Sequence, residues 1–168
     1  MAPSGRTGDV VQGPDGVAVV FDREWTNPPA DVWSALTDPD RLERWFGRWS
    51  GDPTSGTVEV TMTAEEGAPA EPVTIDACER PHRLAVTTGA PGQGWPLDLV
   101  LSSLPDGGTR LRFTHRLRAG DDAASIGVGW HYYLDRLDAV VAGRLPTGSW
   151  DEYFPALAVH YAAPAGPG

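Results

Sequence analysis

Apolar residues recur at intervals of three and four within residues 121–145, near the end of the chain. They are Trp130, Tyr133, Leu134, Leu137, Val140 and Val141. This spacing places all six on one face of an α-helix, which turns through about 100° per residue. A helix over residues 126–145 would be about 30 Å long, and Asp121 and Asp122 are suited to cap its start. The pattern predicts one long amphipathic helix that needs a partner surface.

Alternating apolar and polar residues predict strands through most of the chain before this helix. The expected strands cover residues 16–26, 56–64, 71–80, 83–88, 95–104 and 109–118. The last of these has an apolar face that includes one histidine and consists of Leu111, Phe113, His115 and Leu117. Arginines dominate its other face, which is therefore expected to face solvent.

Two proline-containing signals predict short helices after the first strand. Asn27 and Asp38, each followed by proline, are expected to cap helices over residues 29–37 and 40–46. Gly47 is expected to end the second of them, as glycine commonly does at a helix C-terminus.

Together these elements predict an α+β fold in which a curved antiparallel sheet packs against one long C-terminal helix. Such a sheet exposes one face to solvent and must cover the other. The length of 168 residues fits one domain. We expect residues 15–146 to form it, residues 1–14 to be a flexible tail, and residues 147–168 to be an extension with a short helical segment and a loose end.

Composition and charge limit the possible partners. The formal net charge of −10 argues against nucleic acids, whose phosphates need a basic surface, and against anionic membranes. No apolar run approaches the roughly 20 residues of a membrane span, and we find no signal-peptide pattern. A single cysteine, Cys78, allows no internal disulfide, which suits a cytoplasmic protein. The absence of lysine excludes Schiff-base catalysis.

Four segments carry a family resemblance. They are PPADVWSALTDPDRLERWFG (28–47), EPVTIDACERPHRLAVTT (71–88), GGTRLRFTHRL (107–117) and GWHYYLDRL (129–137). In this order the chain resembles the START-like (SRPBCC) superfamily, and within it the bacterial family related to the C-terminal domain of the activator of the heat-shock-protein-90 ATPase. The resemblance covers roughly residues 17–145.

The resemblance implies a helix-grip fold, in which the curved sheet wraps around the long helix and usually leaves a cavity between them. Members of the superfamily bind lipids, sterols, polyketides or other apolar molecules in this cavity. Some are cyclases or aromatase-like enzymes, and the eukaryotic relative is a co-chaperone. This chain lacks the co-chaperone's other domain, so a chaperone role is not implied directly.

The candidate ligand-binding residues lie on the apolar face of the last strand, on the long helix and on the second short helix. They are Trp45, Phe46, Phe113, His115, Trp130, Tyr133 and Leu134. His115 could orient a ligand or move a proton, with Tyr133 or Trp130 as its partner. The alternative is a core histidine with a satisfied hydrogen bond, among aromatic residues that only fill the core.

The sequence predicts neither a metal site nor a cofactor. The four histidines lie far apart, with no cysteine or carboxylate at ligand spacing. Parity in its strand places Cys78 on the face opposite Val73 and Ile75, which predicts an unreactive thiol.

Three functions remain open at this point. The leading one is a module that binds a small hydrophobic or aromatic molecule beneath the long helix. The second is a cyclase or hydrolase with His115 as general acid or base, which requires a second polar group within hydrogen-bond reach. The third is a protein-interaction module, including ATPase activation, which predicts a sizeable exposed patch.

Overall fold

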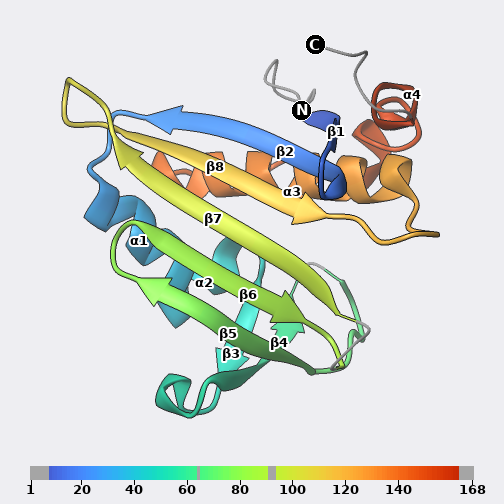
Figure 1. Ribbon diagram of the computed structural model, residues 1–168. Helices are drawn as coiled ribbons and strands as arrows, with labels where there is room; N and C mark the ends of the chain where they lie inside the picture. The colour runs from blue at the N-terminus through green and yellow to red at the C-terminus, as the bar shows by residue number, and fades with distance from the viewer. Residues whose placement is uncertain (1–7, 64, 91–93, 163–168) are drawn as a thin grey trace.

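A single eight-stranded antiparallel sheet forms the body of the protein, and the helices lie on one of its faces (Figure 1). The computed structural model describes residues 8–63, 65–90 and 94–162. The strands are β1 (Asp9–Gly13), β2 (Gly16–Trp25), β3 (Gly47–Ser50), β4 (Thr57–Met62), β5 (Glu71–Glu79), β6 (Arg83–Thr88), β7 (Trp95–Ser103) and β8 (Thr109–Arg116). Their order across the sheet is β1-β2-β8-β7-β6-β5-β4-β3. The predicted curved sheet with a long C-terminal helix is confirmed.

The helices cover different halves of the sheet. The long helix α3 (Ala123–Val141) lies behind β2 and β8, whereas α1 (Pro29–Thr37) and α2 (Pro39–Trp45) lie behind the half that contains β5 and β6 (Figure 1). A 3-10 turn, η1 (Pro53–Ser55), joins β3 to β4, and η2 (Trp150–Glu152) and α4 (Ala158–Tyr161) follow α3. Because different helices cover the two halves, the packing between helix and sheet differs from one half of the sheet to the other.

Helix α3 is held against β2 and β8 by large apolar side chains. Leu134 and Leu137 are fully buried, and so is Leu111 on the facing strand. Phe21 and Phe113 pack edge to face, with ring centroids 6.3 Å apart. The predicted apolar stripe therefore forms the centre of the core, and α3 is closely packed on the sheet where Leu134 and Leu137 lie.

The helix starts follow the predicted chemistry in two of three cases. The side chain of Asp122 accepts from Ala124 N at the start of α3, and that of Asp38 accepts from Asp40 N at the start of α2. Asn27 is not the cap of α1, which begins after Pro28. The Asn27 amide instead donates to the Asp31 carboxylate at 2.8 Å. It therefore stabilises the first turn of α1 from the position that precedes the cap residue, Pro28.

Two short edge strands were not predicted. Residues 9–13, placed by sequence in a flexible tail, form β1 and pair with β2 from Asp9↔Val20 to Gly13↔Gly16. The described domain therefore begins before residue 15; residues 1–7 lie outside the described part. Strand β3 begins at Gly47, which was expected only to end a helix. At Gly47 a Cβ would collide with the backbone of Thr61, which explains the need for glycine there.

The extension after α3 folds back onto the body. Tyr161 of α4 is fully buried, and its hydroxyl lies 2.9 Å from Gly8 N, which donates to it. Gly127 of α3 faces the Tyr161 ring so closely that a Cβ at this position would collide with it. The predicted short helical segment corresponds to η2 and α4; the expected loose end at residues 163–168 lies outside the described residues.

Candidate functional site

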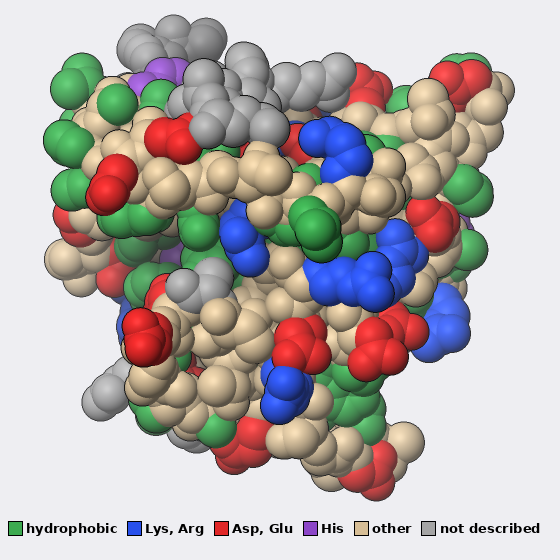
Figure 2. Space-filling view, turned by 180° about the vertical axis from the view of Figure 1, so that it is seen from behind, with side chains coloured by type: hydrophobic (Ala, Val, Ile, Leu, Met, Phe, Trp, Pro, Cys, Tyr) green, Lys and Arg blue, Asp and Glu red, His purple; other side chains and the backbone are tan. Residues whose placement is uncertain are grey.

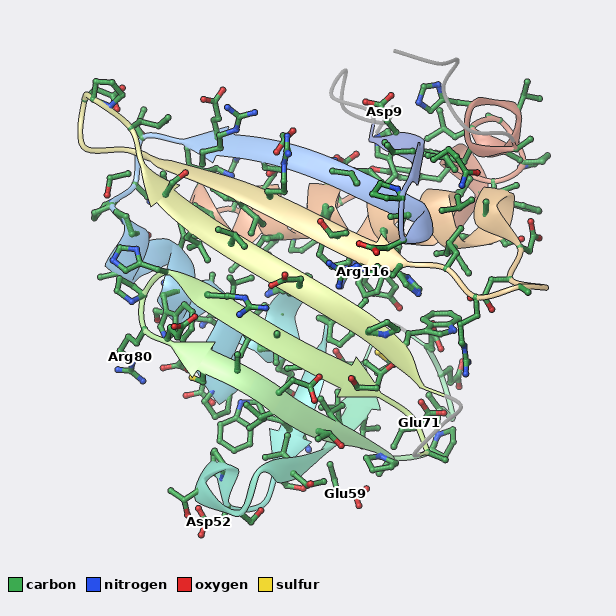
Figure 3. All side chains as sticks on the ribbon, in the orientation of Figure 1. Asp9, Asp52, Glu59, Glu71, Arg80 and Arg116 are labelled. Carbon is green, nitrogen blue, oxygen red and sulfur yellow. The ribbon has the colours of Figure 1, made fainter. Side chains whose placement is uncertain are left out.

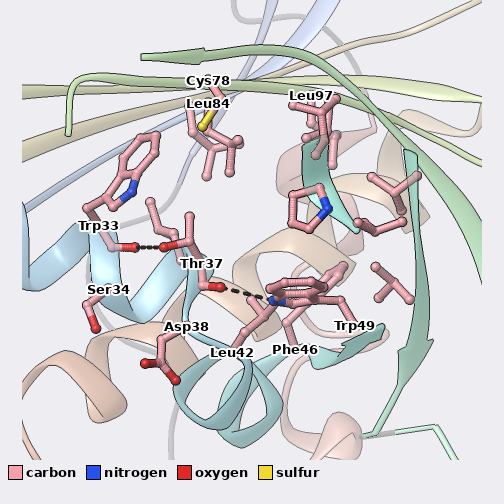
Figure 4. A pocket seen from close by; sticks show the side chains of 18 of the residues that line it. Trp33, Ser34, Thr37, Asp38, Leu42, Phe46, Trp49, Cys78, Leu84 and Leu97 are labelled. Carbon is pink, nitrogen blue, oxygen red and sulfur yellow. Dashed lines mark hydrogen bonds between the residues drawn. The ribbon is translucent and has the colours of Figure 1, made fainter. Parts of the chain in front are cut away.

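An apolar pocket of about 870 Å³ lies between the sheet and the two short helices; we call it the main pocket (Figure 4). Its floor is the inner face of β4–β7 and its roof is α1 and α2. The lining residues that matter below are Trp33, Trp45, Phe46, Trp49, Val86, Leu97, Phe113 and Trp130. Helix α3 contributes only Trp130 to this lining, so the space lies beside the long helix and not beneath it.

The mouth of the main pocket is marked by exposed residues among its lining. Asp38 and Pro39 lie at the start of α2, Pro53 lies in η1, and Cys78 and Arg80 lie at the end of β5. Arg80 projects outward beyond the end of its strand (Figure 3). The polar groups therefore gather at the opening, whereas the interior is almost wholly apolar.

Cys78 faces the main pocket, contrary to the prediction from strand parity. The pairing of β5 with β6 shifts between Ile75 and Ala77, as in a β-bulge. One extra residue reverses the alternation beyond it. Cys78 therefore pairs with Leu84, and both line the pocket (Figure 4).

A second pocket, of about 1150 Å³, lies on the other side of Phe46 and Trp130. These two residues line both spaces, and their rings are stacked with centroids 5.9 Å apart. The second pocket is more polar, because Glu65, Asp122 and other acidic side chains border it. Val60, Val73 and Thr88 also line both spaces, so the two rings form the aromatic part of the boundary between an apolar pocket and an acidic one.

Hydrogen bonds fix three of the four tryptophans of the main pocket. Trp45 Nε1 donates to Ala35 O at 2.8 Å, and Trp49 Nε1 donates to Thr37 O at 3.0 Å. The bond of Trp49 is drawn in Figure 4. Trp130 Nε1 donates to an imidazole nitrogen on β8, described next. These bonds hold the aromatic side chains in place and satisfy the hydrogen-bonding capacity of the three indole N–H groups.

His115 lies behind the wall of the pockets and lines neither of them. It is fully buried, and its Nδ1 accepts the indole N–H of Trp130 at 2.9 Å. Burial lowers the pKa of the imidazole to about 4. The structure therefore keeps His115 neutral and in contact with Trp130, and the predicted role in contacting a ligand has no support in its position.

The other predicted site residues separate into two groups. Trp45, Phe46, Phe113 and Trp130 line the main pocket. Tyr133 lines only the second pocket, where its hydroxyl donates to Glu65 at 3.1 Å and burial raises its pKa. Leu134 is fully buried in the core and lines neither pocket.

The sequence reading missed two features of the interior. Trp33 and Trp49 line the main pocket, although neither was among the predicted site residues and the strand of Trp49 was not predicted. Arg23 is buried with 1% exposure and forms ion pairs with Asp135 at 2.8 Å and Asp138 at 2.5 Å. Burial raises the pKa of Asp138, although the Arg23 charge acts in the opposite direction. Strand parity with Phe21 was the available signal, because it points Arg23 toward α3.

The described residues contain neither a cluster of metal ligands nor a membrane-spanning helix. Acidic and basic side chains are interspersed on the side that carries the helices (Figure 2). Within residues 8–63, 65–90 and 94–162, no three His, Cys, Asp or Glu side chains gather as metal ligands would. In the same part of the chain, no helix has the length and apolarity required to span a bilayer.

Solved structures with this fold include proteins of moderate sequence identity. The solution structure of CalU16 from Micromonospora echinospora is 30% identical, with 86% of this chain and 80% of that chain covered and a TM-score of 0.65. A protein encoded by gene BPP1335 of Bordetella parapertussis is 26% identical over 96% of this chain and 92% of that chain, with a TM-score of 0.65. DynU16, of the dynemicin biosynthetic locus, shares the fold at 24% identity and a TM-score of 0.65; the match covers 77% of this chain and 48% of DynU16.

Among curated proteins, no sequence matches this chain significantly. The family described as activator of Hsp90 ATPase homolog 1-like protein, however, matches residues 26–142. This range runs from the end of β2 through α3, so it includes every element that lines the main pocket. The protein therefore belongs to the activator of Hsp90 ATPase homolog 1-like family and has the START-like fold.

Proposed function

We propose that this protein binds a small apolar or aromatic molecule in the main pocket. The observation that carries the proposal is a space of about 870 Å³ that is walled by aromatic and aliphatic side chains. Pockets for small ligands usually have volumes of about 300–1,000 Å³ and apolar walls with few polar groups. Family membership and the START-like fold support the same function.

The site differs from the predicted one in its position. A ligand would lie between α1, α2 and β4–β7, and would touch α3 only at Trp130. Hydrophobic transfer would drive binding, because each buried apolar Å² contributes about 25 cal/mol. The exposed residues at the mouth would leave a route for entry from solvent.

The geometry does not favour catalysis by His115. A general acid or base must reach the substrate directly or through one water molecule, and His115 is fully buried and lines neither pocket. Its pKa of about 4 also leaves it neutral near pH 7. The protein-interaction role stays a prediction.

Titration with N-phenyl-1-naphthylamine, a neutral dye that fluoresces in apolar sites, tests the proposal. Val86→Trp would fill the main pocket, because Val86 lines it. Val100→Trp is the matched control, because Val100 is 41% exposed on the neighbouring strand and does not line the pocket. We expect Val86→Trp to weaken dye binding by about tenfold or more, as steric mismatches in apolar sites do, and Val100→Trp to leave it unchanged. Equal binding by both folded variants would exclude the main pocket as the site.

A further inference from the structure

The second pocket lies toward the end of the sheet opposite to the mouth of the main pocket. Arg80, at the mouth of the main pocket, directly follows β5, whereas Glu71, an exposed residue in the lining of the second pocket, is the first residue of β5. Figure 3 shows these two residues at the two ends of that strand. The volume of about 1150 Å³ is also bordered by the start of α3 and by η2. The two spaces therefore have different surroundings and different routes to solvent.

Among the described residues, every charged side chain that lines the second pocket is acidic. These side chains belong to Glu65, Glu71, Asp121 and Asp122. Glu71 lies opposite Val60 in the pairing of β4 with β5. Because directly opposite residues of an antiparallel pair point to the same face of a sheet, Glu71 shares the inner face with the buried Val60. Carboxylates around one hollow, with no basic side chain in its described lining, give it a negative potential that attracts cations.

Two tryptophans of the second pocket keep a large part of their surface accessible. Trp95, the first residue of β7, is 38% exposed, and Trp150 of η2 is 41% exposed. Each ring packs against one neighbouring ring, so the exposed part is available to a further group. Tyr132 also lines this space, but the guanidinium of Arg136 already lies over its ring, 5.5 Å from the centroid. The accessible aromatic surface is therefore supplied mainly by the two tryptophans.

Trp150 belongs to a part of the chain that the family match does not include. The match ends at residue 142, and Trp150 follows in the extension. The extension is fixed to α3, because Tyr153 donates its hydroxyl to Asp135 at 2.7 Å and the ring of Trp150 contacts that of Tyr132 edge to face, with centroids 5.6 Å apart. This chain therefore adds an aromatic side chain of its own to the second pocket.

We propose that the second pocket binds an organic cation, in which a quaternary ammonium group lies against Trp95 and Trp150 and close to Glu71. The inference goes beyond the proposed function, because it assigns a different space and a positively charged ligand. The face of an indole attracts a cation within about 6 Å of the ring centroid, and quaternary ammonium ligands are recognised in this way. The carboxylates offset the hydration that the cation loses, whereas an anion would lose its hydration without a counter-charge.

The cation 3-hydroxyphenyltrimethylammonium and the neutral 3-tert-butylphenol form a suitable pair of probes, because they have nearly the same shape and differ mainly in charge. Their affinities are measured on the full chain in a nitrogen–proton correlation spectrum. The titration is followed at the indole N–H signal of Trp95, because Trp95 lines only the second pocket. The ratio of the two affinities isolates the effect of the positive charge, since hydrophobic transfer is common to both probes.

Three variants locate the source of this ratio. Glu71→Gln removes a carboxylate of the pocket at constant size, and Trp150→Leu removes an aromatic ring. Glu59→Gln is the matched control, because Glu59 is exposed, precedes Val60 in the same strand and lines neither pocket. We expect the wild-type protein to favour the cation by about tenfold. The ratio should fall by about threefold in Glu71→Gln and in Trp150→Leu, and should be unchanged in Glu59→Gln.

The possible results separate this inference from the proposed function. Equal affinities of the two probes for the wild-type protein would overturn the inference. A ratio that falls as much in Glu59→Gln as in Glu71→Gln would also overturn it, because the net charge of −10 would then be the cause. Dye binding in the main pocket is unaffected by either result, since Trp95 does not line that space. If a variant does not fold, the wild-type ratio decides.

Discussion

Trp130 Nε1 donates a hydrogen bond to His115 Nδ1 over 2.9 Å, between α3 and β8. Because the indole can only donate, Nδ1 must be unprotonated, and the neutral ring carries its proton on Nε2. Protonation of Nδ1 would break this bond in a buried environment. Burial accordingly lowers the pKa of His115 to about 4, so the contact between the helix and the sheet depends on a neutral imidazole.

This lowered pKa predicts a loss of stability in mild acid. An unfolded histidine has a pKa of about 6.5, so between about pH 6.5 and about pH 4 the unfolded state binds more protons than the folded state. Stability is therefore complete above this window and decreases as the pH falls through it. From about pH 7.5 to about pH 5 we expect His115 to cost about 2 kcal/mol of the free energy of unfolding.

Urea unfolding at the two pH values measures this effect. His115→Asn is the matched variant, because its amide oxygen can accept from Trp130 but does not titrate in this range. The variant should lose about 2 kcal/mol less than the wild-type protein on acidification. An identical pH dependence in both proteins would show that His115 is not kept neutral by the fold.

The buried ion pairs of Arg23 predict a large effect from a single substitution. Arg23→Met removes the positive charge between Asp135 and Asp138 and leaves two carboxylates close together. We expect a loss of about 3–5 kcal/mol in the free energy of unfolding. Arg112→Met is the control, because Arg112 pairs with Asp22 on the exposed face, and exposed pairs contribute about 1 kcal/mol or less. Similar losses in the two variants would contradict this prediction.

Two glycines of α3 are expected to respond in opposite ways to alanine. In Gly127→Ala the new Cβ would collide with the Tyr161 ring, so the extension would have to move, at a cost of about 1–3 kcal/mol. In Gly129→Ala the Cβ would meet no atom within 4 Å, and helix propensity should add about 0.5–1 kcal/mol. Thermal unfolding of both variants gives the sign of each change. A stabilising Gly127→Ala would show that Tyr161 is not docked on α3.

The thiol of Cys78 offers a chemical measure of occupancy in the main pocket. Cys78 is exposed at the mouth and is the only cysteine of the chain, so a thiol reagent modifies a single known position. A dye bound in the pocket should slow the reaction by about tenfold at a concentration about ten times its Kd. The Val86→Trp variant should show no such protection. Unchanged reactivity at saturating dye would place the dye elsewhere.

Local sequence patterns were sufficient for the long helix, the two short helices, the longer strands and most of their buried faces. The spacing of Leu134 and Leu137 predicted the inner side of α3, and alternation predicted that Leu99 and Phe113 face inward; all four are buried. The short edge strands β1 and β3 escaped notice because four or five residues carry too little alternation to be recognised.

The position of the pocket was not available from local patterns. It depends on how far α3 is offset across the sheet, which leaves one half of the sheet to α1 and α2. The predicted orientation of Cys78 was wrong because the register shift in β5 exchanges the inward-facing and outward-facing positions beyond Ile75. The residue types around the shift do not indicate it. The burial of Arg23 was not predicted, because arginine is almost never fully buried unless it is paired. The local pattern around Arg23 did not identify its partners, Asp135 and Asp138.

The stacked rings of Phe46 and Trp130 form part of the boundary between the two pockets. Both rings line both pockets, but they are held differently: Trp130 is fixed by its bond to His115, whereas Phe46 has no polar anchor. Phe46 is instead held by its ring contacts with Trp45, Trp130 and Tyr133. The two spaces therefore share one side chain that a hydrogen bond fixes and one that only packing holds.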